Sequence, residues 1–220
     1  MMQVCFSSVP PALDSPLESE PWSGAEAFTL SHARPEGSSH CPRVTVRLLH
    51  DREAVSVRFQ VWDRHILCRH TAYQDPVCRD SCVEWFAQPR PDKGYVNFEI
   101  NCGGALHCSY IEDPTRTPQG FARRVMVPEE SARLLTIHHT LPSVVDPAID
   151  EPTVWEVGLR VPFVFWDPFT GPTGPVPGQT WRGNFYKCGG SPDYRHWLSW
   201  QPVGELNFHR PQDFGPFRFA

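Results

Sequence analysis

Apolar and polar residues alternate along several short segments of this chain, and the alternation predicts β-strands. Between residues 54 and 62, for example, Val55, Val57, Phe59 and Val61 all fall on one face. Successive side chains of a strand point to opposite faces, so this pattern is typical of a strand with one buried side. The segments with the clearest alternation are 43–49, 54–62, 95–101 and 153–161.

The segment 95–101 is unusual because its polar face carries no lysine, threonine or arginine. Tyr95, Asn97, Glu99 and Asn101 share that face. A phenol, two amides and a carboxylate are short groups that hydrogen-bond hydroxyls. The preceding segment, 82–88, predicts a neighbouring strand that carries Glu84. Two adjacent strands with this polar face suggest a binding surface on a β-scaffold.

The rest of the chain contains short strand signals separated by turns and loops. Further strands are expected at 105–111, 179–188 and 214–219, loops at 113–120 and 162–178, and irregular structure over 1–26, where 1–20 form a lead-in. The pattern over 121–140 fits strands or a short helix. Evenly spaced strands without an amphipathic helix predict an all-β fold, a single antiparallel β-sandwich of the jelly-roll or immunoglobulin-like kind, over residues 1–220.

Composition narrows the class of partner and the cellular compartment. The chain has 220 residues and a net charge of −5, so it lacks the basic surface expected of a nucleic-acid-binding protein. Its first residues show neither the basic nor the apolar region of a signal peptide, and no stretch is apolar enough to span a membrane. We therefore expect a cytoplasmic protein whose eight cysteines are mostly reduced.

Six motifs resemble those of family 9-like carbohydrate-binding proteins, in the order that this family shows. They are the segments Asp75–Phe86, Tyr95–Gly104, Trp155–Phe163, Trp181–Gly189, His196–Trp200 and Asn207–Gly215. The resemblance extends over about residues 20–220. It implies a β-sandwich that binds a sugar without catalysis.

The resemblance also implies particular site residues. In this family a sugar lies between two tryptophans, its hydroxyls are held by a Glu and an Asn, and structural calcium is present. The Glu corresponds to Glu84 and the Asn to Asn184, whereas the first of the two tryptophan positions is occupied by Cys78. A structural calcium ion is accordingly possible here, although the sequence does not identify its ligands.

We expect the ligand, a mono- or oligosaccharide, to be bound by polar side chains together with aromatic rings. A ring face packs on the apolar C–H face of a pyranose while polar neighbours fix its hydroxyls. The candidate ligand-binding residues are Glu84, Asn97, Glu99, Asn101, Asn184, Lys187, Tyr73, Trp181, Tyr186 and Trp197. Asn184 and Lys187 are three positions apart on one strand, so they point to opposite faces unless a bulge intervenes.

Other kinds of site have weaker sequence support. The carboxylates Glu84 and Glu99 suit glycoside hydrolysis only at a suitable separation in a cleft. Cys102, which lies in a turn, lacks the sequence signature of a nucleophile. The spacing of Cys68, His70, Cys78 and Cys82 matches no usual zinc site. We therefore expect no catalytic residues and no certain cofactor.

Two further functions stay open at this stage. One is a haem- or cofactor-binding sandwich, for which the available side chains are Met126, His107, His138, His139 and His196. The other is a structural or interaction protein that has kept the fold and lost the sugar, which Cys78 at the tryptophan position favours.

Overall fold

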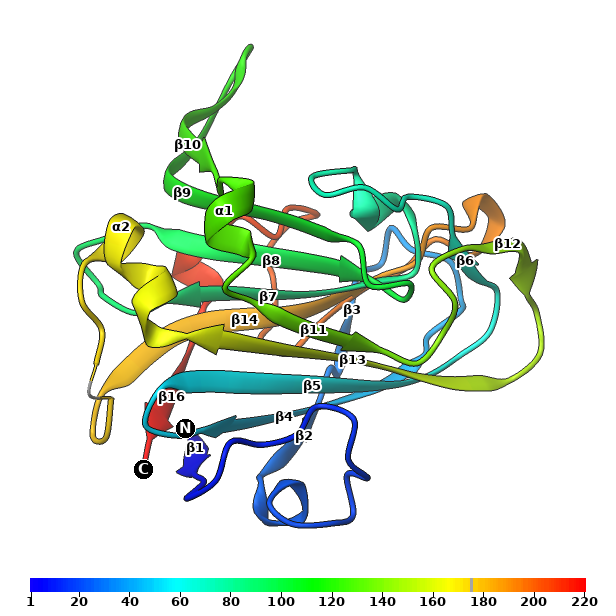
Figure 1. Cartoon of the computed structure of the whole chain (residues 1–220). Coiled ribbons are helices and arrows are strands. Elements are labelled where there is room, and N and C mark those ends of the chain that lie inside the picture. The colour runs from blue at the N-terminus through cyan, green and yellow to red at the C-terminus, as the bar shows by residue number, and fades with distance from the viewer. Residues whose placement is uncertain (175) are drawn as a thin grey trace.

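Two layers of β-strands form the body of the molecule in the computed structural model, which describes residues 1–174 and 176–220 (Figure 1). The strands of the first sheet, in spatial order, are β10 (Gly120–Met126), β9 (Leu106–Thr117), β8 (Tyr95–Asn101), β7 (Cys82–Gln88), β14 (Thr180–Cys188) and β16 (Gly215–Phe219). At its far end β14 also pairs with β15 (Trp197–Ser199), which pairs in turn with β3 (His32–Ala33).

The second sheet lies against the first. Its strands are β4 (Arg43–His50), β5 (Ala54–Asp63), β13 (Thr153–Pro162) and β11 (Thr136–His139) in that order, with β2 (Ala27–Thr29) paired to β4. A separate small sheet joins β6 (Ile66–Cys68) to β12 (Val145–Ile149). Neighbouring strands within these sheets run antiparallel, which confirms the predicted β-sandwich.

The first strand, β1 (Met2–Phe6), is an exception to the antiparallel pattern and connects the two sheets. Met2 to Val4 pair with β16 of the first sheet, and Cys5 and Phe6 pair with β4 of the second, both in parallel orientation. The prediction of irregular structure over 1–26 was therefore wrong for residues 2–6. The two chain ends lie near each other as a result (Figure 1).

The core lies between the sheets and is made by one face of each alternating strand. Val83, Trp85 and Ala87 of β7 contribute to it together with Phe98 of β8 and Phe185 of β14, all of them almost completely buried. These positions are the apolar ones of the sequence pattern, so the faces of β7 and β8 are as predicted. The polar residues of both strands consequently lie on the outer face of the first sheet.

A third layer covers part of that outer face. Val203, Phe208 and Phe214, which belong to the segment that follows β15, form an apolar cluster with outward-facing aromatic residues of the first sheet, such as Phe86 and Tyr186. The sequence pattern alone suggested a sheet face that is open to solvent, but the C-terminal segment covers part of it. That part of the outer face of the first sheet therefore lies beneath the C-terminal segment.

The structure differs from the sequence prediction in two loop regions. Residues 113–120 were expected to form a loop, but β9 continues to Thr117 and forms with β10 a hairpin that extends away from the rest of the molecule (Figure 1). In the predicted loop 162–178, residues 163–170 form helical turns, and residue 175 lies outside the described residues. Long-range pairing and local turns of this kind leave little trace in a periodicity of apolar residues.

The helical segments are all short. They are α1 (Glu129–Ala132), α2 (Asp167–Thr170) and the 3₁₀ turns η1 (Trp22–Gly24), η2 (Val77–Arg79), η3 (Phe163–Trp166), η4 (Pro192–Tyr194) and η5 (Pro211–Asp213). Within the described residues, no helix combines the length and the apolar character needed to cross a membrane.

Candidate ligand-binding pocket

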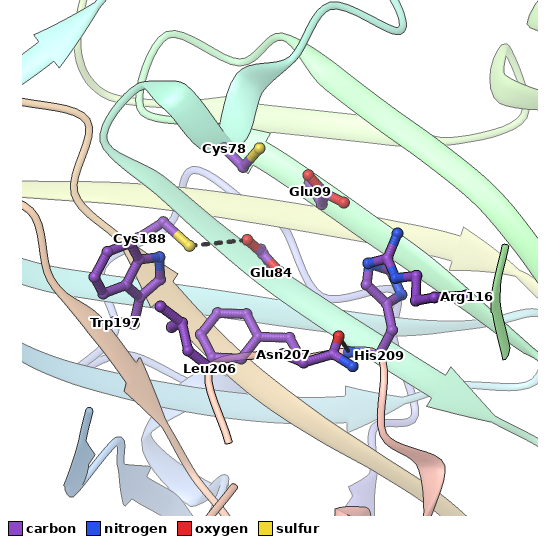
Figure 2. A pocket seen from close by; sticks show the side chains of 10 residues that line it. Cys78, Glu84, Glu99, Arg116, Cys188, Trp197, Leu206, Asn207 and His209 are labelled. Carbon is purple, nitrogen blue, oxygen red and sulfur yellow. Dashed lines mark hydrogen bonds between the residues drawn. The ribbon is translucent and has the colours of Figure 1, made fainter. Parts of the chain in front are cut away.

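A cavity of about 230 Å³ lies between the outer face of the first sheet and the C-terminal segment that covers it. Strands β7, β8 and β14 form its floor, η2 and β15 border it, and Arg116, near the end of β9, reaches its rim. Its lining residues are Cys78, Glu84, Glu99, Arg116, Cys188, Trp197, Leu206, Asn207, Phe208 and His209 (Figure 2). We call this cavity the pocket.

Two carboxyl groups lie side by side on the floor of the pocket. Glu84 of β7 and Glu99 of β8 are direct partners across the antiparallel pair, so their side chains leave the sheet on the same face. Only 3% of Glu84 and 7% of Glu99 is exposed. The Cys188 thiol donates to Glu84 Oε1 at 3.1 Å (Figure 2). Asn97 Nδ2 donates to Glu99 Oε1 at 2.6 Å. One oxygen of each carboxyl is thus held by a neutral donor.

The surroundings of this pair favour its protonated form. Burial raises the pKa of Glu84 well above its usual range, and the neighbouring Glu99 raises it further. Burial likewise raises the pKa of Glu99, an effect that the charges of His107 and Arg124 oppose only in part. Two interacting acids titrate as a unit. The pair therefore takes up protons at a higher pH than exposed carboxyl groups do.

Aromatic and aliphatic side chains form the wall opposite the carboxyl groups. Trp197 and Leu206 stand at one end of the pocket (Figure 2), and Phe208 also lines it. The Phe208 ring stacks on Tyr186 with 3.9 Å between ring centroids and 11° between planes, and the Tyr186 hydroxyl donates to the Phe208 carbonyl at 3.1 Å. Tyr186 is fully buried, so it supports the wall from below.

The other end of the pocket combines Asn207, His209 and Arg116. The Tyr95 hydroxyl lies 2.9 Å from His209 Nδ1, and burial lowers the pKa of this imidazole to about 3. The ring is therefore neutral at physiological pH and shares a hydrogen bond with the tyrosine hydroxyl. Arg116 reaches the pocket from the hairpin, where its guanidinium lies 3.8 Å from the Phe121 ring centroid. This end offers donors that suit hydroxyl groups.

The structure brings Glu84, Glu99 and Trp197 of the predicted residues together in one pocket and places Tyr186 beneath it. Asn97 is buried next to Glu99, where its carbonyl oxygen accepts from the Ser109 backbone and hydroxyl at 3.0 and 2.6 Å. Asn97 thus fixes the position of Glu99.

Two predicted asparagines have roles in holding the chain. Asn184 accepts from the Gln201 backbone N–H at 2.9 Å and donates to its carbonyl at 3.2 Å, so it anchors the covering segment to β14. Asn101 donates to Asp80 and to the His70 carbonyl at 2.8 and 2.7 Å. Neither side chain lines the pocket.

Three of the predicted residues lie away from the pocket. Trp181 and Lys187 occupy odd positions of β14 and point into the sandwich interior, where both are fully buried. Tyr73 donates to the Val127 carbonyl at 2.6 Å and borders a different cavity next to α1. Trp181 and Lys187 are excluded from the pocket because alternation along β14 turns them to its inner face. Tyr73 is excluded because the chain near residue 73 runs past a different cavity.

Sequence reasoning missed the wall made by residues 206–209, together with Arg116 and Cys188. These residues lie in an irregular segment and at or near the ends of strands, where the apolar periodicity carries no information. The motifs Asn207–Gly215 and Trp181–Gly189 contain a signal, because the first includes three residues of the wall and the second includes Cys188. Cys78, at the position where the family resemblance implies a tryptophan, does line the pocket.

Within residues 1–174 and 176–220, no three His, Cys, Asp or Glu side chains are placed so that they could hold a metal ion. Met126 lies on the hairpin strand β10, and His196 lies between η4 and β15. All eight cysteines lie in the described residues and are free thiols.

Comparison with known proteins identifies the family of the chain. The family model for "Carbohydrate-binding family 9" matches residues 24–219. A candidate carbohydrate-binding protein from Bacteroides uniformis has a similar structure, with a TM-score of 0.80 at 24% identity over 100% of this chain and 98% of its own. No curated protein sequence matches the chain.

Two structures of a carbohydrate-binding module from family 9 of Caldicellulosiruptor kristjanssonii share the fold. The complex with cellotriose has a TM-score of 0.68 at 12% identity and covers 100% of this chain and 93% of the module. The complex with glucose has a TM-score of 0.65 at 12% identity, with coverages of 99% and 95%. At these identities the likeness shows a common fold.

Proposed function

Because the chain belongs to carbohydrate-binding family 9, we propose that it binds a carbohydrate without catalysis and that one sugar unit occupies the pocket. The observation that carries this proposal is the arrangement of two buried carboxyl groups opposite an aromatic wall in one cavity. Cellotriose and glucose are bound by similar folds of the same family, which supports a sugar as the ligand.

The pocket has the two kinds of surface that a pyranose needs. The C–H groups of a sugar ring are apolar and pack on aromatic faces such as those of Trp197 and Phe208, whereas its hydroxyls need donors and acceptors. The free oxygens of Glu84 and Glu99 provide acceptors at the floor. A hydrogen bond to a charged group contributes about 1.5–3 kcal/mol, so an ionised carboxyl of this pair is expected to provide much of the specificity.

The size of the pocket favours a single sugar unit. Its volume of about 230 Å³ is below the range of roughly 300–1,000 Å³ that is usual for sites of drug-sized ligands. Cys78 is smaller than the tryptophan of the family pattern, so one aromatic contact is absent at this position. We expect a dissociation constant of about 1 mM, which corresponds to about −4 kcal/mol.

The arrangement of the carboxyl groups argues against hydrolysis. Glycoside hydrolases place their two carboxyl groups on either side of the scissile bond and give them different pKa values. Here Glu84 and Glu99 leave adjacent strands on the same face and lie on one floor, and the pKa values of both are raised. A sugar above this floor meets both groups from the same side.

The proposal is tested by calorimetric titration of a panel of monosaccharides and disaccharides, glucose among them, into the purified protein. The expected result is saturable binding of at least one sugar, reduced about ten- to a hundredfold by Glu84→Gln and also weakened by Trp197→Ala. Glu130→Gln, an exposed glutamate of α1, is the matched control and should leave the affinity unchanged. If no sugar of the panel binds the wild type, or if Glu84→Gln binds equally well, the pocket is not the sugar site.

A further inference from the structure

The carboxyl pair in the pocket has no counter-ion. No Lys, Arg or His nitrogen of the described residues lies within 4.0 Å of a carboxyl oxygen of Glu84 or Glu99. Each pair member instead contacts a neutral donor, Cys188 or Asn97. Burying two neighbouring acids without a cation is costly, and a purely structural floor could be made at lower cost from neutral residues.

The charged and titratable groups around the pair come from every element that faces it. Glu99 lies opposite His107 of β9, and the remaining groups are Cys78 of η2, Cys188 of β14, Arg124 of β10, Arg116 of the hairpin and His209 of the covering segment. The Arg116 guanidinium is stacked on Phe121, and His209 is neutral. Arg116 and His209 thus lie towards one end of the pocket (Figure 2). The charges of His107 and Arg124 act on Glu99 from beyond ion-pair distance, so no cation of the described residues pairs with the two carboxyls.

From this arrangement we infer that the preferred ligand of the pocket is a sugar with a protonated amine, a hexosamine-like unit whose ammonium group is held between Glu84 and Glu99. An ammonium has three donors, which match the free oxygens of the two carboxyls. The aromatic wall and the Asn207 end then receive the ring and its hydroxyls. This inference rests on the proposed function and specifies its ligand class.

Binding of such a ligand changes the proton content of the pair. Two carboxylates then face one ammonium, so a proton that the pair holds before binding leaves to the buffer. A neutral sugar needs no such change, because a protonated carboxyl can donate to a hydroxyl. Proton release therefore distinguishes the two kinds of ligand.

The test compares sugars that differ only in the amine. Glucosamine and glucose, and galactosamine and galactose, are titrated calorimetrically at pH 7 in phosphate and in Tris, together with N-acetylglucosamine as a neutral derivative. We expect the amine to increase the affinity of at least one pair about tenfold or more. The binding heat of that amino sugar should differ between the buffers by the ionisation heat of the released proton.

A matched variant separates this charge effect from general damage to the pocket. Glu99→Gln leaves one carboxyl and should reduce the ratio of amino-sugar to neutral-sugar affinity about tenfold, whereas Glu130→Gln should leave the ratio at the wild-type value. Equal affinity for the members of each pair would overturn the inference while the sugar-binding function stands. If no sugar binds in any form, both fail.

Discussion

Two buried groups of charged residues lie on opposite faces of β14, and only one of them is internally neutralised. On the inner face, the Lys187 ammonium is 3.2 Å from Asp63 Oδ2 and donates to the Cys188 carbonyl at 2.7 Å and to His196 at 3.0 Å. On the outer face, the hydrogen bonds to Glu84 and Glu99 within the described residues come from neutral donors. The inner cluster thus contains its own counter-ion, as a structural group does, whereas the proposed ligand would supply one to the outer pair.

The electrostatics of the two groups differ in the same sense. Burial alone would raise the pKa of Asp63, but the Lys187 charge and the His40 hydrogen bond more than offset it, so the pKa lies well below the usual range. For Glu84, burial and the neighbouring Glu99 act together and raise the pKa. A strongly perturbed pKa of a buried acid is characteristic of functional sites.

The largest expected effect is on the inner cluster. Lys187→Met removes the cation and leaves the Asp63 charge uncompensated in the core, which should lower the free energy of unfolding by about 3–5 kcal/mol. Urea denaturation followed by tryptophan fluorescence measures the change. Adding Asp63→Leu to Lys187→Met should recover much of the loss, since two apolar residues then replace the pair. A single variant as stable as the wild type would contradict the structural role of the cluster.

The pH dependence of stability should have opposite signs for the two groups. The raised pKa values of Glu84 and Glu99 mean that their contribution is present below the unfolded-state pKa, about 4.3, and is lost as the pH rises through the folded-state values. The lowered pKa of Asp63 means that its contribution is present above about 3.9 and is lost as the pH falls.

Urea denaturation between pH 3 and 8, at about one-unit intervals, tests both signs. Relative to the double variant Glu84→Gln, Glu99→Gln, the wild type should lose stability as the pH rises above about 4. Relative to Asp63→Asn, it should lose stability as the pH falls towards 3. If ionisation of the pair in the folded state had no cost, the wild type and the double variant would have the same free energy of unfolding above pH 5.

The contrast between the two faces also shows which features the sequence could predict. Alternation assigned the strands and faces of β7 and β8, and therefore the common face of Glu84 and Glu99. The same rule places Lys187 and Asn184 on opposite faces of β14, but it does not say which face is the interior. That depends on packing against the second sheet, where Asp63 is contributed by a strand more than a hundred residues earlier in the chain.

The parts that could not be predicted depend on contacts between distant segments. The wall formed by Leu206, Asn207, Phe208 and His209 belongs to irregular chain whose position is fixed by its contacts with β14, including the hydrogen bonds of Asn184 to Gln201. Similarly, β1 is a strand because it pairs with both β16 and β4. Such pairings leave no local pattern in a segment of five residues.

The smallest effect is expected where the pocket departs from the family pattern. Cys78 lies at the rim of the pocket next to Glu99 and is exposed to solvent. A larger side chain at this position can therefore extend over the pocket without entering the core. Cys78→Trp should add a second aromatic face and strengthen sugar binding by about 0.5–1.5 kcal/mol, which is roughly two- to tenfold. Calorimetry with the best sugar of the panel measures this, and Cys78→Ser is the control for loss of the thiol. A tryptophan variant that binds more weakly than Cys78→Ser, at unchanged melting temperature, would mean that the indole blocks the entrance, and that the pocket is shaped for its ligand without a second aromatic wall.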